Sequence, residues 1–316
     1  MEKVLVTGGA GFIGSNLVEA LLQKSAEVRV LDDFSTGYKE NILTDPKVFL
    51  MRGDVRDQSL LESAVQGTDT IFHLAASVGN RRSLENPVSD AEINILGTLR
   101  LLQAARQAHV RKIVFSSSAA IFGELRLFPI QEDHPIAPDS FYGSSKFVAE
   151  RDCLIFGALH GISVTCLRYF NVYGPNQRYD AYGNVIPIFC NRILRGRKLT
   201  IYGDGEQTRD FISVHDVVRA NLLAVESEIS EALNVGSGEE ITINKLAQMV
   251  QEAADVNIGV EYAPPRLGDV RHSRAGISRA RDVLGFNPSV SLREGLHEYV
   301  KWLRADPITR ASLGGD

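Results

Sequence analysis

Residues 4–17 read VLVTGGAGFIGSNL, an apolar, β-branched run followed by clustered glycines and the start of an amphipathic segment. Gly8, Gly11 and Gly14 stand where the chain leaves the predicted strand and enters the predicted helix. Glycine permits a tight turn and a close approach of the backbone to a pyrophosphate, and the free N–H groups of a helix start attract that anion. The stretch therefore predicts the first strand–turn–helix of a dinucleotide-binding unit.

A carboxylate at the end of the next predicted strand supports this interpretation. Asp32 follows Gly14 by 18 residues, where it can accept hydrogen bonds from both hydroxyls of an adenosine ribose. No arginine follows it in LDDFSTG, and the carboxylate would repel a 2′-phosphate, so NAD is predicted rather than NADP. Asp54 in RGDVRD ends the third predicted strand and has two interpretations: it binds the adenine amine, or it caps the next helix.

Short apolar runs alternate with longer amphipathic stretches through the first half of the chain. The runs show little polar alternation, as expected for strands that are covered on both faces. This alternation predicts an α/β fold, a Rossmann-type doubly wound parallel sheet with right-handed crossovers. The predicted strands are residues 4–7, 28–32, 48–51, 70–75, 112–117 and 163–168.

The sequence changes character after about residue 170, where a long polar segment rich in Gly and Tyr begins. We expect the chain to leave the Rossmann domain here for a smaller domain, to return once, and to end in a loose tail. The expected boundaries are 1–169 and about 209–238 for the NAD-binding Rossmann domain, 170–208 and 239–304 for a smaller C-terminal α/β substrate domain, and 305–316 for the tail. The returning part is predicted to hold strands at 211–216 and 232–237.

Composition restricts the class of protein. The chain has 316 residues, 44% of them hydrophobic and 23% charged, as in an ordinary globular protein. Its net charge of −5 argues against a basic groove for nucleic acid.

Its three cysteines lack metal-ligand spacing, so we expect them to be buried and free, and we expect no metal site. No apolar run reaches the ~18 residues of a membrane span, and VLVTGG begins without a signal-peptide pattern, which indicates a cytoplasmic, non-membrane protein.

The segment FYGSSK, residues 141–146, places Tyr142 four residues before Lys146, on one face of a predicted helix. A phenol ordinarily titrates near pH ~10, so it can act as a base near neutral pH only if positive charges stabilise the phenolate. A buried ammonium and a positively charged nicotinamide together could do so. Serines in SSSAAIFG, residues 116–123, end the fifth predicted strand at the sheet edge where ligands bind. The sequence therefore predicts a Ser–Tyr–Lys catalytic site.

Taken together, these motifs resemble the extended short-chain dehydrogenase/reductase superfamily. Within it, the chain is similar to the UDP-glucose (UDP-galactose/UDP-N-acetylglucosamine) 4-epimerase group of the NAD-dependent epimerase/dehydratase family. The resemblance covers about residues 3–303 and rests on TGGAGFIG, LDDF, GDVRD, HLAA, NILGT, SSSAAIFG, YGSSK, LRYFNVYGP, QTRDFISVHD and GDVRHS. It implies a homodimer formed through the helices at 92–108 and 141–158.

The resemblance also implies roles for single residues. Catalysis is assigned to Ser118, Tyr142 and Lys146. Contacts with NAD are assigned to Gly8, Gly11, Phe12, Ile13, Gly14, Asp32, Asp54, Val55, Leu74, Ala75, Asn94, Tyr142 and Lys146. Contacts with a UDP-sugar are assigned to Ser118, Asn171, Asn184, Val185, Arg209, Arg266, Asp269 and Ser273.

The implied reaction is the 4-epimerisation of a UDP-hexose through a transient 4-keto intermediate. Family members that dehydrate or decarboxylate keep an acidic residue where this chain has Ala119 or Ala120, so dehydration is disfavoured. Ser273 aligns with a gate that is small in enzymes admitting N-acetylated sugars. Arg81 and Arg82 could instead favour a carboxylate, as in UDP-glucuronate, or could serve helix packing alone.

Two alternatives stay open at this stage. The chain could be an epimerase or net oxidoreductase of the same superfamily that acts on a UDP-uronate or a dTDP-sugar. It could also be a binding protein that senses a nucleotide and has lost catalysis, although the Ser–Tyr–Lys set argues against this.

Overall fold

The computed structural model describes residues 3–123, 127–180, 183–265 and 270–313. Two predicted substrate contacts, Arg266 and Asp269, lie outside the described residues. The strands are β1 Lys3–Thr7, β2 Glu27–Asp32, β3 Val48–Arg52, β4 Thr70–His73, β5 Lys112–Ser118, β6 Ser163–Tyr169, β7 Asn171–Tyr173, β8 Leu199–Tyr202, β9 Thr208–Arg209, β10 Phe211–Ser213, β11 Ala232–Val235, β12 Ile241–Thr242 and β13 Val260–Ala263.

The helices alternate with these strands along the chain. They are α1 Phe12–Gln23, η1 Lys39–Asn41, α2 Gln58–Val65, α3 Asn80–Glu85, α4 Pro87–Ala91, η2 Glu92–Gly97, α5 Thr98–Gln107, η3 Ala119–Phe122, α6 Phe141–His160, α7 Val185–Leu194, α8 Val214–Glu226, α9 Ile243–Ala254, α10 Ser278–Leu284, α11 Leu292–Ala305 and α12 Pro307–Leu313.

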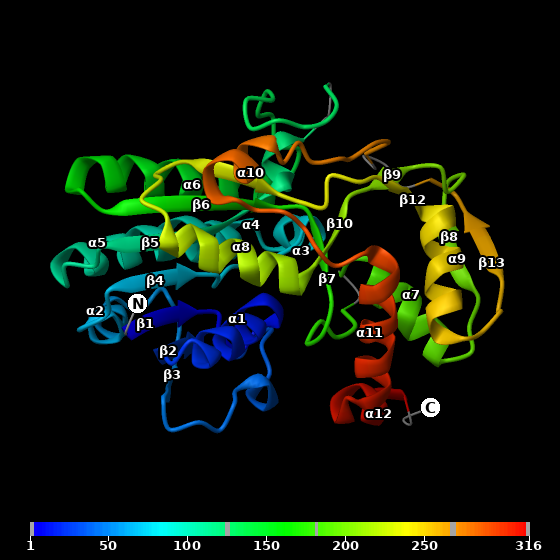
Figure 1. Ribbon diagram of the computed structural model, residues 1–316, viewed down its shortest axis with the longest axis horizontal. Coiled ribbons are helices and arrows are strands. Elements are labelled where there is room, and N and C mark those ends of the chain that lie inside the picture. Colours follow the sequence, from blue (N-terminus) through cyan, green and yellow to red (C-terminus); the bar gives the residue numbers. More distant parts are fainter. Residues whose placement is uncertain (1–2, 124–126, 181–182, 266–269, 314–316) are drawn as a thin grey trace.

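In the described part of the chain, seven parallel strands form one sheet in the order β11-β6-β5-β4-β1-β2-β3. The strand order reverses between β1 and β4, because β2 and β3 extend the sheet on one side and β4 begins the other. At such a switch point the connections diverge to opposite faces and leave a crevice at the carboxyl ends of the strands. This architecture confirms the predicted doubly wound Rossmann-type sheet (Figure 1).

Helices cover both faces of this sheet (Figure 1). On one face α1 and α8 pack together and bury apolar side chains such as Leu17 and Val217 against the strands. On the other face α2, α5 and α6 do the same with side chains such as Leu61 and Leu102. The strands between these layers are apolar on both sides, which is why their sequences lack polar alternation.

The outermost strand, β3, departs from that expectation. Phe49 is 52% exposed and Leu50 is 38% exposed, so this apolar run is not covered on both faces. The reason is its place at the edge of the sheet, where β2 is its one hydrogen-bonded neighbour within the described residues. An apolar run predicts a strand, but it does not reveal whether that strand is central or at an edge.

A third apolar cluster lies away from the seven-stranded sheet. It is formed mainly by α7, α9 and α11 with β8, and its buried residues include Phe189, Leu246 and Tyr299. Figure 1 shows these elements grouped beside the sheet and its helices. The division of the chain into a Rossmann domain and a substrate domain at the boundaries given above stays a prediction.

The returning segment 211–216 is partly different from the prediction. Strand β10 ends at Ser213, because that side chain accepts a hydrogen bond from the N–H of His215 and begins α8. In addition, β10 pairs with β7 in a separate two-stranded ladder instead of joining the large sheet. The second predicted strand, 232–237, appears as β11 at the edge of the large sheet.

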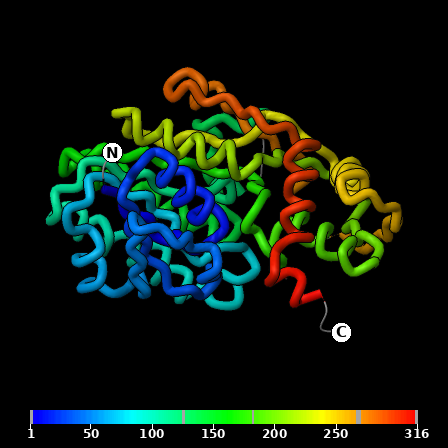
Figure 2. The backbone as a smooth tube through the Cα atoms, turned by 60° about the horizontal axis from the view of Figure 1, so that its bottom comes forward, coloured from blue at the N-terminus to red at the C-terminus, as the bar shows by residue number. Residues whose placement is uncertain are grey.

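The expected loose tail is wrong for the residues from Asp306 to Leu313. Asp306 accepts two hydrogen bonds from the guanidinium of Arg178, at 2.6 and 3.0 Å, and both side chains are buried. The same guanidinium lies over the rings of Tyr38 and Trp302, with 4.4 and 5.3 Å to the ring centroids. Figure 2 shows α11 and α12, in red, beside the elements of the third cluster. The polar sequence of this segment therefore gave no sign that Asp306 fixes it to the buried Arg178.

The structure also bears on the cysteines, on metal-binding clusters and on membrane-spanning helices. Cys153, Cys166 and Cys190 are buried and free, as predicted. Within the described residues, no cluster of His, Cys, Asp and Glu could hold a metal ion. A search of that same part of the chain also finds no helix of the length and apolarity that crossing a membrane requires.

We predict that Asp306→Ala lowers the free energy of unfolding by about 3 kcal/mol, because it leaves the buried Arg178 without its carboxylate. Burial raises the pKa of Asp306, but hydrogen bonds from Arg178 and Thr309 outweigh it, so the pKa lies below its ordinary value. The carboxylate therefore stabilises the fold above its unfolded-state pKa and loses this effect as the pH falls through the folded-state pKa.

Urea unfolding at neutral pH and below pH ~4 measures the effect, and the difference between variant and wild type should shrink in acid. Glu298→Ala is the matched control, because Glu298 on α11 forms an exposed pair with His215. It should change stability by less than about 0.5 kcal/mol. Equal losses for the two variants would contradict the anchoring role of Asp306.

Candidate active site

A cleft of about 1260 Å³ opens at the carboxyl ends of the strands, where the strand order reverses. It is lined on one side by the ends of β1, β2, β4 and β5 and on the other by residues between Phe170 and Asn184. The predicted site residues that line it are Gly8, Gly11, Phe12, Ile13, Gly14, Asp32, Asp54, Val55, Leu74, Ala75, Ser118, Tyr142, Lys146, Asn171, Asn184, Arg209 and Ser273. The cleft thus gathers residues that are far apart in the sequence.

The glycine turn fits a pyrophosphate because a side chain would close it. Gly8 has φ +71°, and a Cβ there would lie 2.7 Å from the backbone nitrogen of Ala75. A Cβ on Gly14 would lie 2.1 Å from the carbonyl oxygen of Gly8. No described side chain caps α1 at Gly11, so the first-turn N–H groups at Phe12 and Ile13 are directed to the cleft.

The carboxylate of Asp32 is held in place by two backbone amides. Its two oxygens accept hydrogen bonds from the N–H groups of Ala10 and Phe34, each at 2.8 Å. Burial raises the pKa of Asp32, and these two amides act in the opposite direction. Because the amides fix the positions of both oxygens, the remaining lone pairs of the carboxylate point in defined directions and can accept hydrogen bonds from ribose hydroxyls. These acceptor atoms therefore fit the ribose of an adenine dinucleotide.

Asp54 lies in the same cleft but does not cap a helix. The residue that caps α2 is Asp57, whose side chain accepts the N–H of Leu60. Asp54 instead accepts hydrogen bonds from the guanidinium of Arg56 at 2.6–3.0 Å. The N-cap interpretation of Asp54 is therefore wrong, and the adenine contact stays a prediction.

The predicted catalytic residues converge from two elements. Ser118 ends β5, whereas Tyr142 and Lys146 lie on α6. The side chain of Ser118 is near enough to the phenol of Tyr142 to lower its pKa. The helix can approach this strand end because position 143 is glycine: a Cβ on Gly143 would lie 2.4 Å from the carbonyl oxygen of Ala120.

The start of α6 is fixed by its neighbours. Ser140 caps the helix by accepting the N–H of Gly143 at 3.1 Å. Ser83 on α3 accepts the N–H of Tyr142 at 3.0 Å. These contacts leave Tyr142 little freedom to move away from Ser118.

Burial dominates the electrostatics of Tyr142. It raises the pKa of Tyr142 to about 12, the hydrogen bond with Ser118 lowers it, and the charge of Asp90 raises it. Lys146 is not among the groups that lower it. Burial therefore penalises the phenolate more than the protein's own groups compensate, and the joint effect of Lys146 and a positively charged nicotinamide stays a prediction.

Lys146 itself remains charged at neutral pH. Burial lowers the pKa of Lys146 to about 8, against the opposing effect of groups that include Asp90 and Glu150. Its Nζ lies 4.3 Å from the centroid of the Phe115 ring, a cation–π contact. Burial lowers the pKa of His73 to about 3, and the charge of Lys146 contributes, so this imidazole adds no second positive charge.

A buried network beneath the catalytic residues was missed by the sequence analysis. Asp90 accepts hydrogen bonds from Ser145 at 2.5 Å and from Asn94 at 3.2 Å. Asn94 is not among the lining residues of the cleft as described; it bonds the backbone of Ser77, which does line it. The four-residue spacing of Asp90 and Asn94 was a usable signal. The π-helical turn η2, Glu92–Gly97, was not foreseeable from that spacing.

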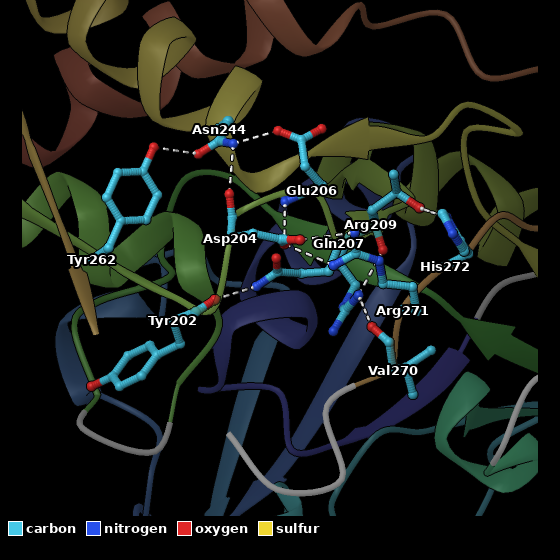
Figure 3. Close-up of polar contacts among 11 residues, drawn as sticks. Tyr202, Asp204, Glu206, Gln207, Arg209, Asn244, Tyr262, Val270, Arg271 and His272 are labelled. Carbon is cyan, nitrogen blue, oxygen red and sulfur yellow. Dashed lines mark hydrogen bonds and ion pairs between the residues drawn. The ribbon is translucent and has the colours of Figure 1, made fainter. Parts of the chain in front are cut away.

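At the other end of the cleft, Arg209 is held by backbone carbonyls (Figure 3). Its guanidinium donates to the oxygens of Thr208 and Val270, each at 2.6 Å. Next to it, Arg271 forms a two-pronged ion pair with Asp204 at 2.7 and 3.0 Å (Figure 3). These contacts join the segment around residue 205 to the segment around residue 271 and fix the position of Arg209.

Asp210 is a second residue that sequence reasoning missed. It is fully buried and accepts hydrogen bonds from the N–H groups of Ser237, Gly238 and Ala275 at 2.7–3.0 Å. Its neighbours in the chain and in space, Arg209 and Ser273, line the cleft. The sequence shows an aspartate next to the arginine in QTRDF. It does not show which groups bond this aspartate, because they come from distant segments of the chain.

The other predicted substrate contacts within the described residues differ in whether they line the cleft. Asn171 lines the cleft and donates from its side chain to the carbonyl oxygen of Asp210 at 3.0 Å. Asn184 lines it at the start of α7, and Ser273 lines it while 8% exposed. Val185 begins α7 and is not among the lining residues of the cleft as described.

Arg81 and Arg82 differ in their surroundings. Arg81 lines the cleft but is largely exposed, and it lies 3.5 Å from Glu85 on the same helix. Arg82 forms an ion pair with Asp180 at 2.9 Å, and both of these residues line the cleft. Helix packing therefore does not account for Arg82.

The fold and the cleft define a class: a Rossmann-type protein that combines a dinucleotide site with the Ser–Tyr–Lys set of short-chain dehydrogenases/reductases. Residues 4–236 match the model of the NAD dependent epimerase/dehydratase family. The chain belongs to this family.

The chain is similar over nearly its whole length to proteins of related activities. A putative UDP-glucose 4-epimerase of Methanocaldococcus jannaschii is 40% identical, with 95% of this chain and 98% of that protein covered. UDP-glucuronic acid decarboxylase 2 of Arabidopsis thaliana is 36% identical, with 96% and 68% covered. The crystal structure of UDP-glucose 4-epimerase from Thermotoga maritima with UDP-glucose is 39% identical, with a TM-score of 0.92 and with 96% of this chain and 99% of that chain covered.

We predict that Asp32→Asn reduces the preference for NAD over NADP at least about tenfold, because the neutral amide no longer repels a 2′-phosphate. Titration of both nucleotides by calorimetry measures the ratio of their dissociation constants. Asp45→Asn is the matched control, since Asp45 lies outside the cleft lining and accepts the N–H of Lys47. An unchanged ratio in Asp32→Asn would contradict the ribose assignment.

Proposed function

We propose that the protein is an NAD-dependent isomerase that inverts C4 of a UDP-hexose, such as UDP-glucose/UDP-galactose or UDP-GlcNAc/UDP-GalNAc. The observation that carries this proposal is the arrangement at one end of the cleft. Tyr142 lies beside Ser118 and shares its helix with Lys146, while the neighbouring wall is formed by Ala119 and Ala120. This set can move the proton of one sugar hydroxyl, and positions 119 and 120 of the described wall carry no acid for elimination.

In this proposal each catalytic side chain has one task. Tyr142 removes the proton from the 4-hydroxyl and later returns it, and Ser118 bonds the same sugar oxygen and the phenol. Lys146 supplies a buried positive charge on the helix face of Tyr142. NAD, when bound, supplies the redox chemistry at C4 and, in its oxidised form, a positive charge that offsets the effect of burial on the phenol.

The alanines beside Ser118 argue against the chemistry of the dehydratases and decarboxylases in this family. Both Ala119 and Ala120 line the cleft in the short helix η3. A methyl group can neither donate nor accept a proton, so an elimination or protonation at the carbons next to C4 has no partner there. A sugar oxidised at C4 can then be reduced again and released.

Inversion requires that the sugar turn over while the nucleotide stays bound. In this proposal Arg209 and Asn171 hold the diphosphate, because a guanidinium and an amide both donate to phosphate oxygens. The uracil end is assigned to Asn184. Ser273 leaves more room than an aromatic side chain would, which supports acceptance of an N-acetyl group. The free, buried cysteines fit a reducing compartment, so we propose the cytoplasm as its location.

We predict that Tyr142→Phe lowers kcat for the interconversion of UDP-glucose and UDP-galactose about 10³-fold, because the proton of the 4-hydroxyl loses its acceptor. Nucleotide content, measured after acid release of NAD, should stay unchanged, since the ring remains. Tyr202→Phe, on an exposed tyrosine that is not part of the described cleft lining, should leave the rate unchanged. Full activity of the Tyr142 variant would refute the assignment.

We also propose that the protein is a homodimer that pairs through α5 and α6. Exposed apolar residues form one stripe along α6, spaced by seven, seven and four residues: Phe141, Val148, Ile155 and Leu159. Their exposed fractions are 51%, 38%, 50% and 72%. A heptad-spaced stripe of this kind suits packing against a second helix.

Replacing Ile155 and Leu159 together by Asp should therefore convert the dimer into a monomer, because two charges would be buried in the interface. Sedimentation velocity at micromolar concentration distinguishes the two species. Leu127→Asp, which is 63% exposed on a loop, is the matched control and should remain dimeric. A wild-type protein that sediments as a monomer would rule out this proposal.

A further inference from the structure

One ion pair crosses the cleft near the catalytic tyrosine. Arg82 lies on α3, Asp180 lies in the segment between β7 and α7, and both line the cleft. Their closest atoms, Nη2 of Arg82 and Oδ2 of Asp180, are 2.9 Å apart. The side chains are 27% and 44% exposed, so the pair is partly shielded from water.

The arginine side of this pair is fixed to the catalytic helix. Ser83, the next residue on α3, accepts the N–H of Tyr142 at 3.0 Å. Asn80 at the start of α3 accepts the hydroxyl of Ser140, which caps α6. Arg82 therefore belongs to a short helix that is bonded to the part of α6 that carries the catalytic phenol.

The aspartate side is fixed to the opposite part of the cleft. Two residues before Asp180, the buried Arg178 binds Asp306 and also donates to the side chain of Asn41 at 2.8 Å. This anchor limits how far the segment that carries Asp180 can move. The pair thus joins two independently held walls at the sugar end of the cleft.

The charge of Asp180 acts on any charged group of a sugar that enters this part of the cleft. A neutral 6-hydroxymethyl group can bond either partner without separating them. A uronate carboxylate would be attracted by Arg82 but repelled by Asp180, and to use the arginine it must displace the aspartate. Partial burial strengthens both effects relative to water.

We propose that the Arg82–Asp180 ion pair is a specificity determinant that makes the site select UDP-hexoses over UDP-hexuronates. The inference rests on the proposed function, because it assigns the hexose to this end of the cleft. The sequence left open whether Arg82 binds the carboxylate of a uronate substrate. In the structure, Arg82 instead binds a carboxylate of the protein itself, that of Asp180.

The test compares UDP-glucose with UDP-glucuronate in the NAD-loaded enzyme. Asp180→Asn removes the competing charge and keeps the size of the side chain. We expect the ratio of dissociation constants, measured by calorimetry, to shift about fivefold toward UDP-glucuronate, since a half-buried charge pair is worth ~1 kcal/mol. UDP-glucose affinity should change less than about twofold.

Two further variants separate a specific effect from a general one. Asp45→Asn changes the net charge equally, but Asp45 is not among the described lining residues of the cleft, so the ratio should stay as in wild type. Arg82→Gln leaves Asp180 without the cation and should weaken UDP-glucuronate binding several-fold more than UDP-glucose binding. Combining Arg82→Gln with Asp180→Asn should abolish the gain seen with Asp180→Asn alone.

The outcomes distinguish this inference from the proposed function. If the wild-type enzyme interconverts UDP-glucose and UDP-galactose but neither single variant shifts the ratio, the inference is overturned and the function stands. A wild-type preference for UDP-glucuronate also overturns it. If no interconversion occurs, the function fails, and the binding ratios still judge the ion pair. Thermal melting verifies that each variant is folded, and the two single variants test the pair independently.

Discussion

The close approach of α6 to the end of β5 is the constraint on which the site depends. Tyr142 reaches Ser118 because Gly143 lets the helix backbone lie against Ala120, where a Cβ would be 2.4 Å from the carbonyl oxygen. The same approach buries the phenol and Lys146 together. Burial raises the pKa of Tyr142 to about 12 and lowers that of Lys146 to about 8, so both groups favour their neutral forms more than they do in water.

This electrostatic balance gives the cofactor a second role. The side chains of the site keep the phenol protonated, and Asp90 adds to that effect. In the proposed mechanism, a further positive charge beside the phenol favours proton transfer. The proposal therefore links the base to the presence of the oxidised dinucleotide, which suits a reaction whose cofactor is regenerated in every cycle.

The two walls of the cleft are joined by buried or shielded ionic contacts. Arg178 binds Asp306 and Asn41 and thereby connects the segment after β7 with the chain end and with the loop after β2. The Arg82–Asp180 pair joins the same segment to α3. These contacts limit how far the two walls can move apart, which the proposed turning of the sugar would require.

The sequence by itself determined the parallel sheet and named most of the predicted residues that line the cleft, because glycine turns, apolar runs and the Tyr142–Lys146 spacing are local properties. It did not determine the edge position of β3, the helical end of the chain, or the partners of Asp90 and Asp210, since these depend on which distant segments meet. For the same reason the sequence left open which carboxylate Arg82 binds. Only the tertiary structure decided that its carboxylate comes from Asp180, because the contact joins residues 98 positions apart.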